Sequence, residues 1–294
     1  MSAPFLVVGH LGQVGRELML RQAAAAAPLV GIDRETVDIG DASSVDAVVD
    51  RIAPALIINA AAYTAVDKAE SEPALAYAVN RDGPAHLAAA CARRAIPLLH
   101  VSTDYVFDGR KSGAYDEDDP PAPLGVYGAS KLAGDIAVGR ALPQHVLLRT
   151  AWVFSAHGTN FVKTILRLAA ERPALRVVKD QRGCPTPAAA IADALLVIAA
   201  RAAQGHGAWG TYNFCGAPAT TWHGFAKAIV AAAASRGGKS VPVAPIATAD
   251  YPTAARRPVN SVLDCRKIER DYGLAPADWR HGLEAAVAEL MRHE

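Results

Sequence analysis

The fold of this chain is decided by residues 5–15, which read FLVVGHLGQVG. The four apolar residues Phe5 to Val8 predict a short buried strand, and the alanine-rich stretch after the glycines has a helical pattern. Between them, Gly9 suits a tight turn, Gly12 lets the backbone approach a pyrophosphate at a helix N-terminus, and Gly15 allows close packing of the helix. The spacing G-x-x-G-x-x-G is one residue longer than the commonest dinucleotide fingerprint, but a strand before it and a helix after it are the context that the motif requires. These residues therefore predict a dinucleotide-binding unit.

A second strand, residues 28–32, leads into Asp33 and Arg34. This is about 20 residues beyond the glycines, where a carboxylate can bind an adenosine ribose hydroxyl. An arginine at this place can instead pair with a 2′-phosphate. The two side chains together allow either NADH or NADPH as the cofactor. The alternative is that both only cap and solvate a turn.

Strands and helices continue to alternate through the first 100 residues. Leu56 to Asn59 predicts a third strand, and the small residues 60–62 after it leave room for a cofactor backbone. A helix is expected from Val66 through Asn80, until Pro84 forces an adjustment or a restart. Residues 97–101 predict a fourth strand. This alternation predicts an α/β fold with a doubly wound, Rossmann-like parallel sheet.

In the second half of the chain the alternation loosens, and proline and glycine become frequent. We therefore expect a dinucleotide-binding domain over residues 1–150 and mainly a smaller α/β substrate-binding domain over residues 151–294. Ala188–Ala203 reads as a helix and Thr211–Cys215 as a strand. The chain is therefore expected to return to the large sheet within about residues 188–220.

The chemistry is expected between residues 102 and 131. Thr103 follows the fourth strand, and open α/β sheets bind ligands beyond the carboxyl ends of their strands. Tyr127 and Lys131 are four residues apart, so they share one face of a helix. The ammonium of Lys131 is expected to bring the pKa of Tyr127 into a useful range, while Thr103 holds a carbonyl oxygen and a hydride donor reaches the carbon. The alternative is an ordinary amphipathic helix in which Tyr127 packs and Lys131 is solvated.

Composition limits the classes of function. A net charge of +1 and the lack of Lys/Arg runs argue against nucleic acid and against a polybasic membrane anchor as partners. The four cysteines, at positions 91, 184, 215 and 265, form no C-x-x-C pair and suggest neither a zinc site nor a disulfide framework. No signal peptide is expected, and the longest apolar stretch, Pro187 to Ala200, is too short to span a bilayer. A cytoplasmic enzyme acting on a small molecule is the expectation.

Two motifs resemble those of the extended short-chain dehydrogenases/reductases. They are STDYVFDG at residues 102–109 and YGASKLAGD at residues 127–135. Within that family the chain is most similar to the members that reduce dTDP-4-keto-6-deoxy sugars, and the resemblance covers nearly the whole chain. It also includes residues 9–15, 59–70, 149–154 and 255–261.

The resemblance implies NADPH- or NADH-dependent reduction of the 4-keto group of dTDP-4-dehydro-L-rhamnose, the last step to dTDP-L-rhamnose. It assigns catalysis to Thr103, Tyr127 and Lys131, and contacts with the sugar nucleotide to Thr103, Asp104 and Trp152. Related dTDP-sugar 4,6-dehydratases place a glutamate directly after the Thr-Asp pair, whereas this chain has Tyr105, and simple reduction needs no such acid. The residues expected at the cofactor are Gly9, Leu11, Gly12, Gln13, Val14, Asp33, Asp38, Ile39, Ala61, Ala62, Thr64, Tyr127 and Lys131.

Metal binding is not expected. Some enzymes of this family resemble dimers bridged by a magnesium ion that glutamates hold, and the matching position here is Ala189. Glu17 remains, but a lone carboxylate is a poor magnesium site. A metal-free homodimer and a monomer both remain open.

Two other functions remain compatible with these motifs. One is a different nucleotide-sugar epimerase, dehydratase or reductase of the same family. The other is a binding module, because the fold also resembles the regulatory subunit of methionine adenosyltransferase, which keeps a dinucleotide site. Turnover separates the binding module from an enzyme, and stoichiometric oxidation of the cofactor separates a reductase from an epimerase or dehydratase.

Overall fold

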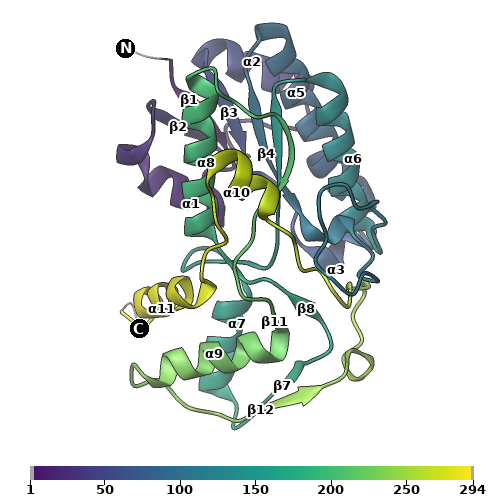
Figure 1. The fold of residues 1–294 in the computed structure, drawn as a ribbon, viewed down its shortest axis with the longest axis vertical. Coiled ribbons are helices and arrows are strands. Elements are labelled where there is room, and N and C mark those ends of the chain that lie inside the picture. Colours follow the sequence, from purple (N-terminus) through teal and green to yellow (C-terminus); the bar gives the residue numbers. More distant parts are fainter. Residues whose placement is uncertain (1–2, 293–294) are drawn as a thin grey trace.

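The computed structural model describes residues 3–292 of the 294-residue chain. At its centre lies a six-stranded parallel sheet in the order β10-β5-β4-β3-β1-β2 (Figure 1). The strands are β1 (Phe5–Val8), β2 (Leu29–Ile32), β3 (Leu56–Asn59), β4 (Leu98–Thr103), β5 (His145–Thr150) and β10 (Gly210–Asn213). The predicted doubly wound parallel sheet is confirmed. Because the strands are parallel, their carboxyl ends lie along one edge of the sheet.

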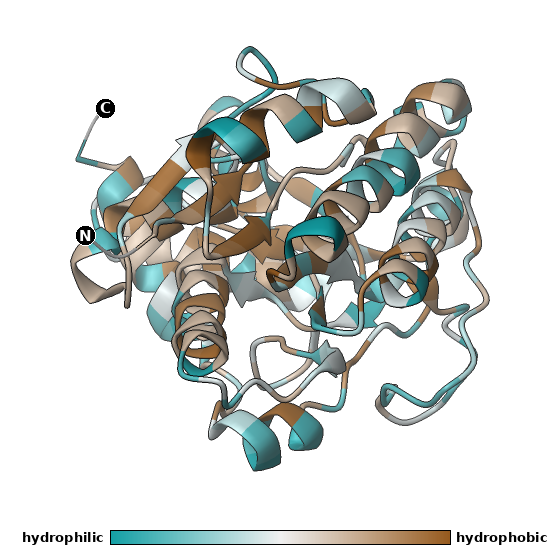
Figure 2. Ribbon diagram, turned by 90° about the horizontal axis from the view of Figure 1, so that it is seen from above, coloured by the Kyte–Doolittle hydropathy of each residue, from teal (hydrophilic) through white to brown (hydrophobic). Residues whose placement is uncertain are grey.

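Helices cover both faces of this sheet (Figure 1). One face packs against α1 (Gln13–Leu20), α8 (Ala188–Ala203) and α10 (Arg266–Tyr272), and the other against α2 (Ala42–Ile52), α5 (Gly83–Arg94) and α6 (Val126–Ala141). Within β1, Phe5 and Val7 belong to the first core, whereas Leu6 and Val8 belong to the second. Figure 2 shows hydrophobic strands surrounded by helices in which hydrophilic and hydrophobic residues alternate. Strands β1 and β3 read as almost continuous apolar runs because both of their faces are buried.

The segment between β3 and α5 is more broken than the sequence predicts. It contains α3 (Val66–Ala69), α4 (Pro73–Tyr77) and a π-helical turn (Ala78–Asp82) that leads directly into α5. The expectation of one helix from Val66 through Asn80 is therefore wrong. Pro73 lies in the first turn of α4, where the missing N–H of proline costs no hydrogen bond. Pro84 instead follows the π-helical turn, in a helical segment that continues into α5.

A second layer lies beyond the carboxyl edge of the sheet, in the lower part of Figure 1. Its apolar core includes Phe154, Phe225, Trp279 and Val287. Its helices are α7 (Phe161–Glu171), α9 (Trp222–Ala234) and α11 (Trp279–Leu290), and its strand pairs are β7 (Leu175–Val178) with β12 (Val243–Ile246), β8 (Arg182–Gly183) with β11 (Thr220–Thr221), and β6 (Val153–Phe154) with β9 (Thr186–Pro187).

The described part of the chain also contains short 3₁₀ turns at Gln22–Ala24, Asp104–Val106 and Thr248–Asp250. Strand β10 comes from the second half of the sequence, yet it pairs with β5 of the large sheet, with Gly210 opposite Val146. Between residues 3 and 292, no helix combines the length and the apolar character needed to cross a membrane.

Candidate functional site

The first turn of the sheet is built around glycine. Gly9 has a φ of +83°, and a Cβ there would lie 2.8 Å from the backbone of Ala61. A Cβ on Gly15 would lie 2.2 Å from the carbonyl oxygen of Gly9. At Gly12, which precedes the first residue of α1, the nearest heavy atom would be 3.3 Å away. Packing within the protein therefore requires glycine at positions 9 and 15, whereas at position 12 it leaves more room, as a close ligand needs.

The other residues expected beside this turn have different surroundings. Leu11 is exposed and Val14 is buried in the core. The side-chain oxygen of Gln13 accepts hydrogen bonds from Ser155 Oγ at 3.1 Å and from Asn160 Nδ2 at 2.9 Å. Asn160 also caps α7. Gln13 therefore joins the start of α1 to the second layer.

At the end of β2, the side chain of Asp33 organises its own turn. Its Oδ1 accepts hydrogen bonds from the backbone of Glu35 and from the backbone and hydroxyl of Thr36. These bonds, with that from the Thr36 hydroxyl first, lower the pKa of Asp33. Arg34 beside it is exposed. One carboxylate oxygen of Asp33 therefore caps the turn, as the alternative interpretation expected.

The remaining residues expected at the cofactor lie at the ends of β2 and β3. Asp38 is exposed and accepts a hydrogen bond from the backbone of Gly40, and Ile39 is buried in the core. Ala61 and Ala62 are half-buried, and Thr64 is exposed. The backbone of Ala61 lies against Gly9, so the turns after β1 and β3 touch each other.

Thr103 and Tyr127 come from two elements that meet at the carboxyl edge. Thr103 is the last residue of β4, and its hydroxyl donates to Asp104 Oδ1 at 3.1 Å. Tyr127 is the second residue of α6, whose backbone N–H at Val126 donates to Glu70 Oε1 at 2.8 Å. A carboxylate at the N-terminus of a helix is stabilised by the helix dipole. Glu70 thereby fixes the start of the helix that carries Tyr127.

A small hollow beside Tyr127 is lined by Glu70, Tyr105, Arg256 and Pro258, among others. The rings of Tyr105 and Tyr127 meet edge to face, with centroids 5.8 Å apart. Burial raises the pKa of Tyr127 to about 12, although the hydroxyl of Thr103 acts in the opposite direction. Tyr127 is therefore a protonated phenol at neutral pH.

Lys131 is oriented differently from what the sequence suggested. Its Nζ donates to the carbonyl oxygen of Val101 at 2.7 Å and lies 3.1 Å from His100 Nε2. Burial raises the pKa of Tyr127, the hydroxyl of Thr103 lowers it, and the charges of Asp104 and Asp135 raise it; Lys131 is not among these causes. The expected lowering of the Tyr127 pKa by Lys131 is therefore not a feature of this arrangement.

The sequence did not predict a buried polar cluster that lies next to Lys131. Asp135 accepts a hydrogen bond from Ser102 Oγ at 2.7 Å and lies 3.8 Å from Arg149 Nε and 3.9 Å from His100 Nε2. Burial raises the pKa of Asp135, and Lys131 lowers it. The available signal was spacing, because Asp135 follows Lys131 by four residues and so shares its face of α6.

Besides Thr103, the residues expected at the sugar nucleotide are Asp104 and Trp152, and both are held within the protein. Asp104 is 2% exposed, and burial raises its pKa to about 7. Among the residues that the structure describes, its Oδ2 has no hydrogen-bond partner. Trp152 has a φ of +46°, and its indole stacks on that of Trp222 and lies against Gly183.

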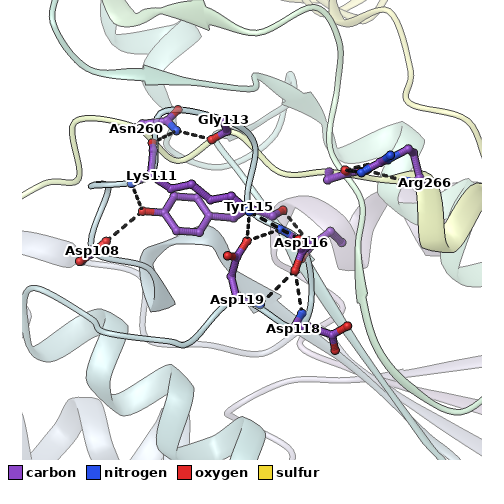
Figure 3. Close-up of polar contacts among 11 residues, drawn as sticks. Asp108, Lys111, Gly113, Tyr115, Asp116, Asp118, Asp119, Asn260 and Arg266 are labelled. Carbon is purple, nitrogen blue, oxygen red and sulfur yellow. Dashed lines mark hydrogen bonds and ion pairs between the residues drawn. The ribbon is translucent and has the colours of Figure 1, made fainter.

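The loop from Asp108 to Asp119 is fastened to the segment around Asn260 (Figure 3). Asn260 Nδ2 donates to the carbonyl oxygens of Lys111 and Gly113, each at 2.8 Å. Tyr115 donates its hydroxyl to Asp108 Oδ1 at 2.9 Å. A hollow of about 390 Å³ adjoins this loop. Four basic residues, Arg110, Lys111, Lys179 and Arg182, line it together with one acidic residue, Asp180.

The position expected to lack a metal ligand lies at the start of α8. Ala189 is half-buried there, and Glu17 on the neighbouring helix α1 forms an ion pair with Arg21 at 2.5 Å. Arg21 also binds Asp193 of α8 at 2.6 Å. In residues 3–292, no group of three or more His, Cys, Asp or Glu side chains is arranged to hold a metal ion.

Comparisons with known proteins agree along the whole chain. The family model described as the RmlD substrate binding domain matches residues 3–292. The chain is similar to a dTDP-4-dehydrorhamnose reductase of Sinorhizobium fredii, with 43% identity over 97% of both chains. It is also similar to one of Aggregatibacter actinomycetemcomitans, with 45% identity over 96% of this chain and 97% of the relative. A crystal structure of the Bacillus anthracis dTDP-4-dehydrorhamnose reductase in complex with NADP superposes with a TM-score of 0.89 at 34% identity, covering 98% of this chain and 100% of the other.

Proposed function

The chain belongs to the family of the RmlD substrate binding domain, together with the dTDP-4-dehydrorhamnose reductases, and we propose that Thr103, Tyr127 and Lys131 carry out its reaction. It is an NADP-dependent oxidoreductase that reduces the 4-keto group of dTDP-4-dehydro-L-rhamnose to give dTDP-L-rhamnose. The observation that carries the residue assignment is the contact between the hydroxyl of Thr103, at the end of β4, and that of Tyr127, at the start of α6.

The residues of the first turn fit a dinucleotide. Gly12 leaves space at the N-terminus of α1, where backbone N–H groups and the helix dipole favour a pyrophosphate. NADPH or NADH, when bound, supplies the hydride. Asp33, Asp38, Ile39, Ala61, Ala62 and Thr64 are proposed to hold the adenosine end and the cofactor backbone, and the exposed Arg34 is proposed to face a 2′-phosphate.

The proposed chemistry uses each side chain in the form that its surroundings favour. Thr103 donates a hydrogen bond to the carbonyl oxygen, and Tyr127, protonated at neutral pH, gives its proton to the alkoxide as that oxygen becomes negative. A charged Lys131, once turned from His100 toward Tyr127, would stabilise the phenolate that remains. Tyr105 offers no carboxyl group at the position where the related dehydratases carry one, which favours simple reduction.

For the sugar nucleotide we propose Asp104 and Trp152 as contacts, with the basic hollow beside Lys111 facing the diphosphate. Residues 1–150 are proposed as the cofactor domain, completed by a return of the chain within 188–220, and residues 151–294 mainly as the substrate domain. All four cysteines are free and buried, which agrees with a reducing cytoplasm. The proposed assembly has no bridging metal, and it is either a homodimer or a monomer.

Consumption of NADPH with the dTDP-4-keto-6-deoxy sugar tests the proposal. One mole of cofactor oxidised per mole of dTDP-L-rhamnose formed is the expected result. A cofactor that is bound but never consumed would point to the binding module, and sugar conversion without net oxidation to an epimerase or dehydratase. Loss of turnover in Tyr127→Phe, with NADPH binding retained, tests the residue assignment separately.

A further inference from the structure

A chain of hydrogen bonds runs from the turn after β3 to the catalytic helix. The backbone N–H of Ala61 donates to Asn59 Oδ1 at 3.1 Å, and Asn59 Nδ2 lies 3.0 Å from His100 Nδ1. His100 Nε2 lies 3.1 Å from Lys131 Nζ, which donates to the carbonyl oxygen of Val101 at 2.7 Å. Asn59 and His100 are paired residues on adjacent strands, and both are fully buried. We call this series the Asn59–His100–Lys131 chain.

The direction of this chain is fixed by its first donor. A backbone N–H can only donate, so the side-chain oxygen of Asn59 faces Ala61 and its NH₂ group faces His100. His100 Nδ1 must then accept, and a neutral imidazole that accepts at Nδ1 carries its proton on Nε2. An Nε2–H group can donate to Lys131 Nζ only if that nitrogen has a lone pair. An ammonium at the same place would set two donors against each other in a buried site.

We propose that Asn59 and His100 are positioning residues that hold Lys131 as a neutral amine, so that Lys131 must leave His100 to become charged. The inference rests on the catalytic role proposed for Lys131. In that role, the charged lysine turns from His100 toward Tyr127, and the neutral lysine is withdrawn onto β4. Protonation and position of the side chain are therefore one event.

The surrounding groups make the neutral form of Lys131 easier to reach than that of an ordinary lysine. Burial lowers the pKa of Lys131 to about 8, against the effect of Asp135, which raises it. Burial, and after it a charge on Lys131, hold the pKa of His100 well below its ordinary value, so the ring is neutral. Arg149 on β5 lies next to Asp135. On the other side of α6, the π-helical turn contributes the uncharged Asn80, which donates to Ser130.

The Asn59–His100–Lys131 chain of hydrogen bonds also predicts how kcat depends on pH. Reduction needs the charged Lys131, so kcat should fall as the pH rises through the pKa of this lysine, near pH 8. Tyr127, with a pKa of about 12, stays protonated over that range and does not cause this fall in kcat.

The Asn59→Asp variant tests the direction of the chain. Its two carboxylate oxygens accept from Ala61 N–H and from His100, so His100 must carry its proton on Nδ1 and present Nε2 as an acceptor for an ammonium. Histidine ¹⁵N chemical shifts report the tautomer, and the ¹³Cε shift of Lys131, assigned by its loss in Lys131→Arg, reports its charge. We expect His100 to be the Nε2–H tautomer in the wild type and the Nδ1–H tautomer in the variant. The titration midpoint of Lys131 should be higher in the variant by about one pH unit or more.

His86 provides an internal control in the same spectra. Its Nδ1 lies 2.9 Å from the carbonyl oxygen of Ile39, which requires an Nδ1–H tautomer in both proteins. An Nδ1–H tautomer at His100 in the wild type would overturn the inference. A Lys131 midpoint that rises while His100 keeps its Nε2 proton would also overturn it, because attraction between charges alone then explains the rise.

A second variant, His100→Gln, tests the same inference if Asn59→Asp does not fold. A glutamine can accept from Asn59 and donate to Lys131, so it preserves the direction, and the Lys131 midpoint should stay within about half a unit of the wild type. A larger shift counts against the inference. A different outcome is that the titration midpoint of Lys131 rises in Asn59→Asp as expected while the pH at which kcat falls stays unchanged. In that case the positioning inference stands and the catalytic role of Lys131 fails.

Discussion

The indole rings of Trp152 and Trp222 are stacked, with centroids 3.5 Å apart and 6° between their planes. Trp152 follows the end of β5, and Trp222 is the first residue of α9 in the second layer. The pair thus joins the carboxyl edge of the sheet to a helix of the smaller layer. It also holds Trp152 in a left-handed backbone conformation, which a non-glycine residue rarely adopts without support from its surroundings.

Removing the stacking partner should loosen Trp152 and weaken sugar-nucleotide binding. An aromatic pair of this kind is worth about 0.5–1.5 kcal/mol, so Trp222→Leu should raise the KM for the sugar nucleotide by up to about tenfold. The KM for NADPH should not change. Trp222→Phe keeps a stacking ring and is the matched control. Equal changes in both KM values for Trp222→Leu would instead indicate a general loss of structure.

Tyr127→Phe should abolish proton donation with little change in volume. We expect kcat to fall by about 10²–10⁴-fold, while the dissociation constant for NADPH, measured by fluorescence, stays nearly constant. Tyr272→Phe is the control, because it removes a phenol on α10 whose hydroxyl binds the carbonyl oxygen of Ala208. Near-normal turnover in a folded Tyr127→Phe protein would refute the assignment of Thr103, Tyr127 and Lys131 as the catalytic centre.

Cofactor preference should depend on Arg34. Arg34→Ala removes the side chain proposed to pair with the 2′-phosphate, so the KM for NADPH should rise by about tenfold while that for NADH stays unchanged. Arg51→Ala, at the exposed end of α2, removes an equal charge elsewhere and serves as the control. Parallel losses with both cofactors would mean that Arg34 does not contact the phosphate.

Asp104 should make the stability of the protein depend on pH. Its folded pKa, about 7, lies above the ordinary 3.8, so the folded state binds the extra proton between these values and stability falls as the pH rises through that window. Asp104→Asn has no such cost. Relative to the wild type, its free energy of unfolding should gain about 2–3 kcal/mol between pH 5 and pH 8 in urea titrations. Identical pH profiles for the two proteins would contradict the raised pKa.

Chelation should leave the enzyme unchanged. Ala189 offers no ligand atom, and Glu17 is already paired with Arg21, so a magnesium ion would have to displace a cation that the protein itself supplies. Treatment with EDTA should alter neither kcat nor the sedimentation coefficient. A dimer that dissociates on chelation, and forms again with added magnesium, would show that a metal bridge exists.

Much of the fold was readable because local pattern and burial agree. Strands β1 and β3 are short apolar runs, and the helix expected over Ala188–Ala203 has those bounds in the structure. The segment from Val66 to Asn80 was not readable, because its form depends on distant contacts. Asn80, in the π-helical turn, binds both backbone groups of Tyr63 and the hydroxyl of Ser130.

The site was predictable only in part for a similar reason. Motif spacing identified Thr103, Tyr127 and Lys131 as candidates. The partners of Lys131 depend on strand register, which places Asn59 directly opposite His100. Two polar residues within otherwise apolar strands were the only signal of this contact in the sequence. The direction in which Lys131 points could not be inferred from helix periodicity, which fixes a face and not a rotamer.

The late arrival of β10 has a consequence for synthesis of the protein. Residues 210–213 cover the edge of β5, but they leave the ribosome about 60 residues after that strand. At typical rates of translation, the nascent sheet would expose an unpaired, apolar edge strand for roughly 3–12 seconds. Slow codons or a pause within this interval would extend the time during which unfinished chains can associate with one another. The yield of the enzyme in cells is therefore expected to depend on chaperones that bind during translation.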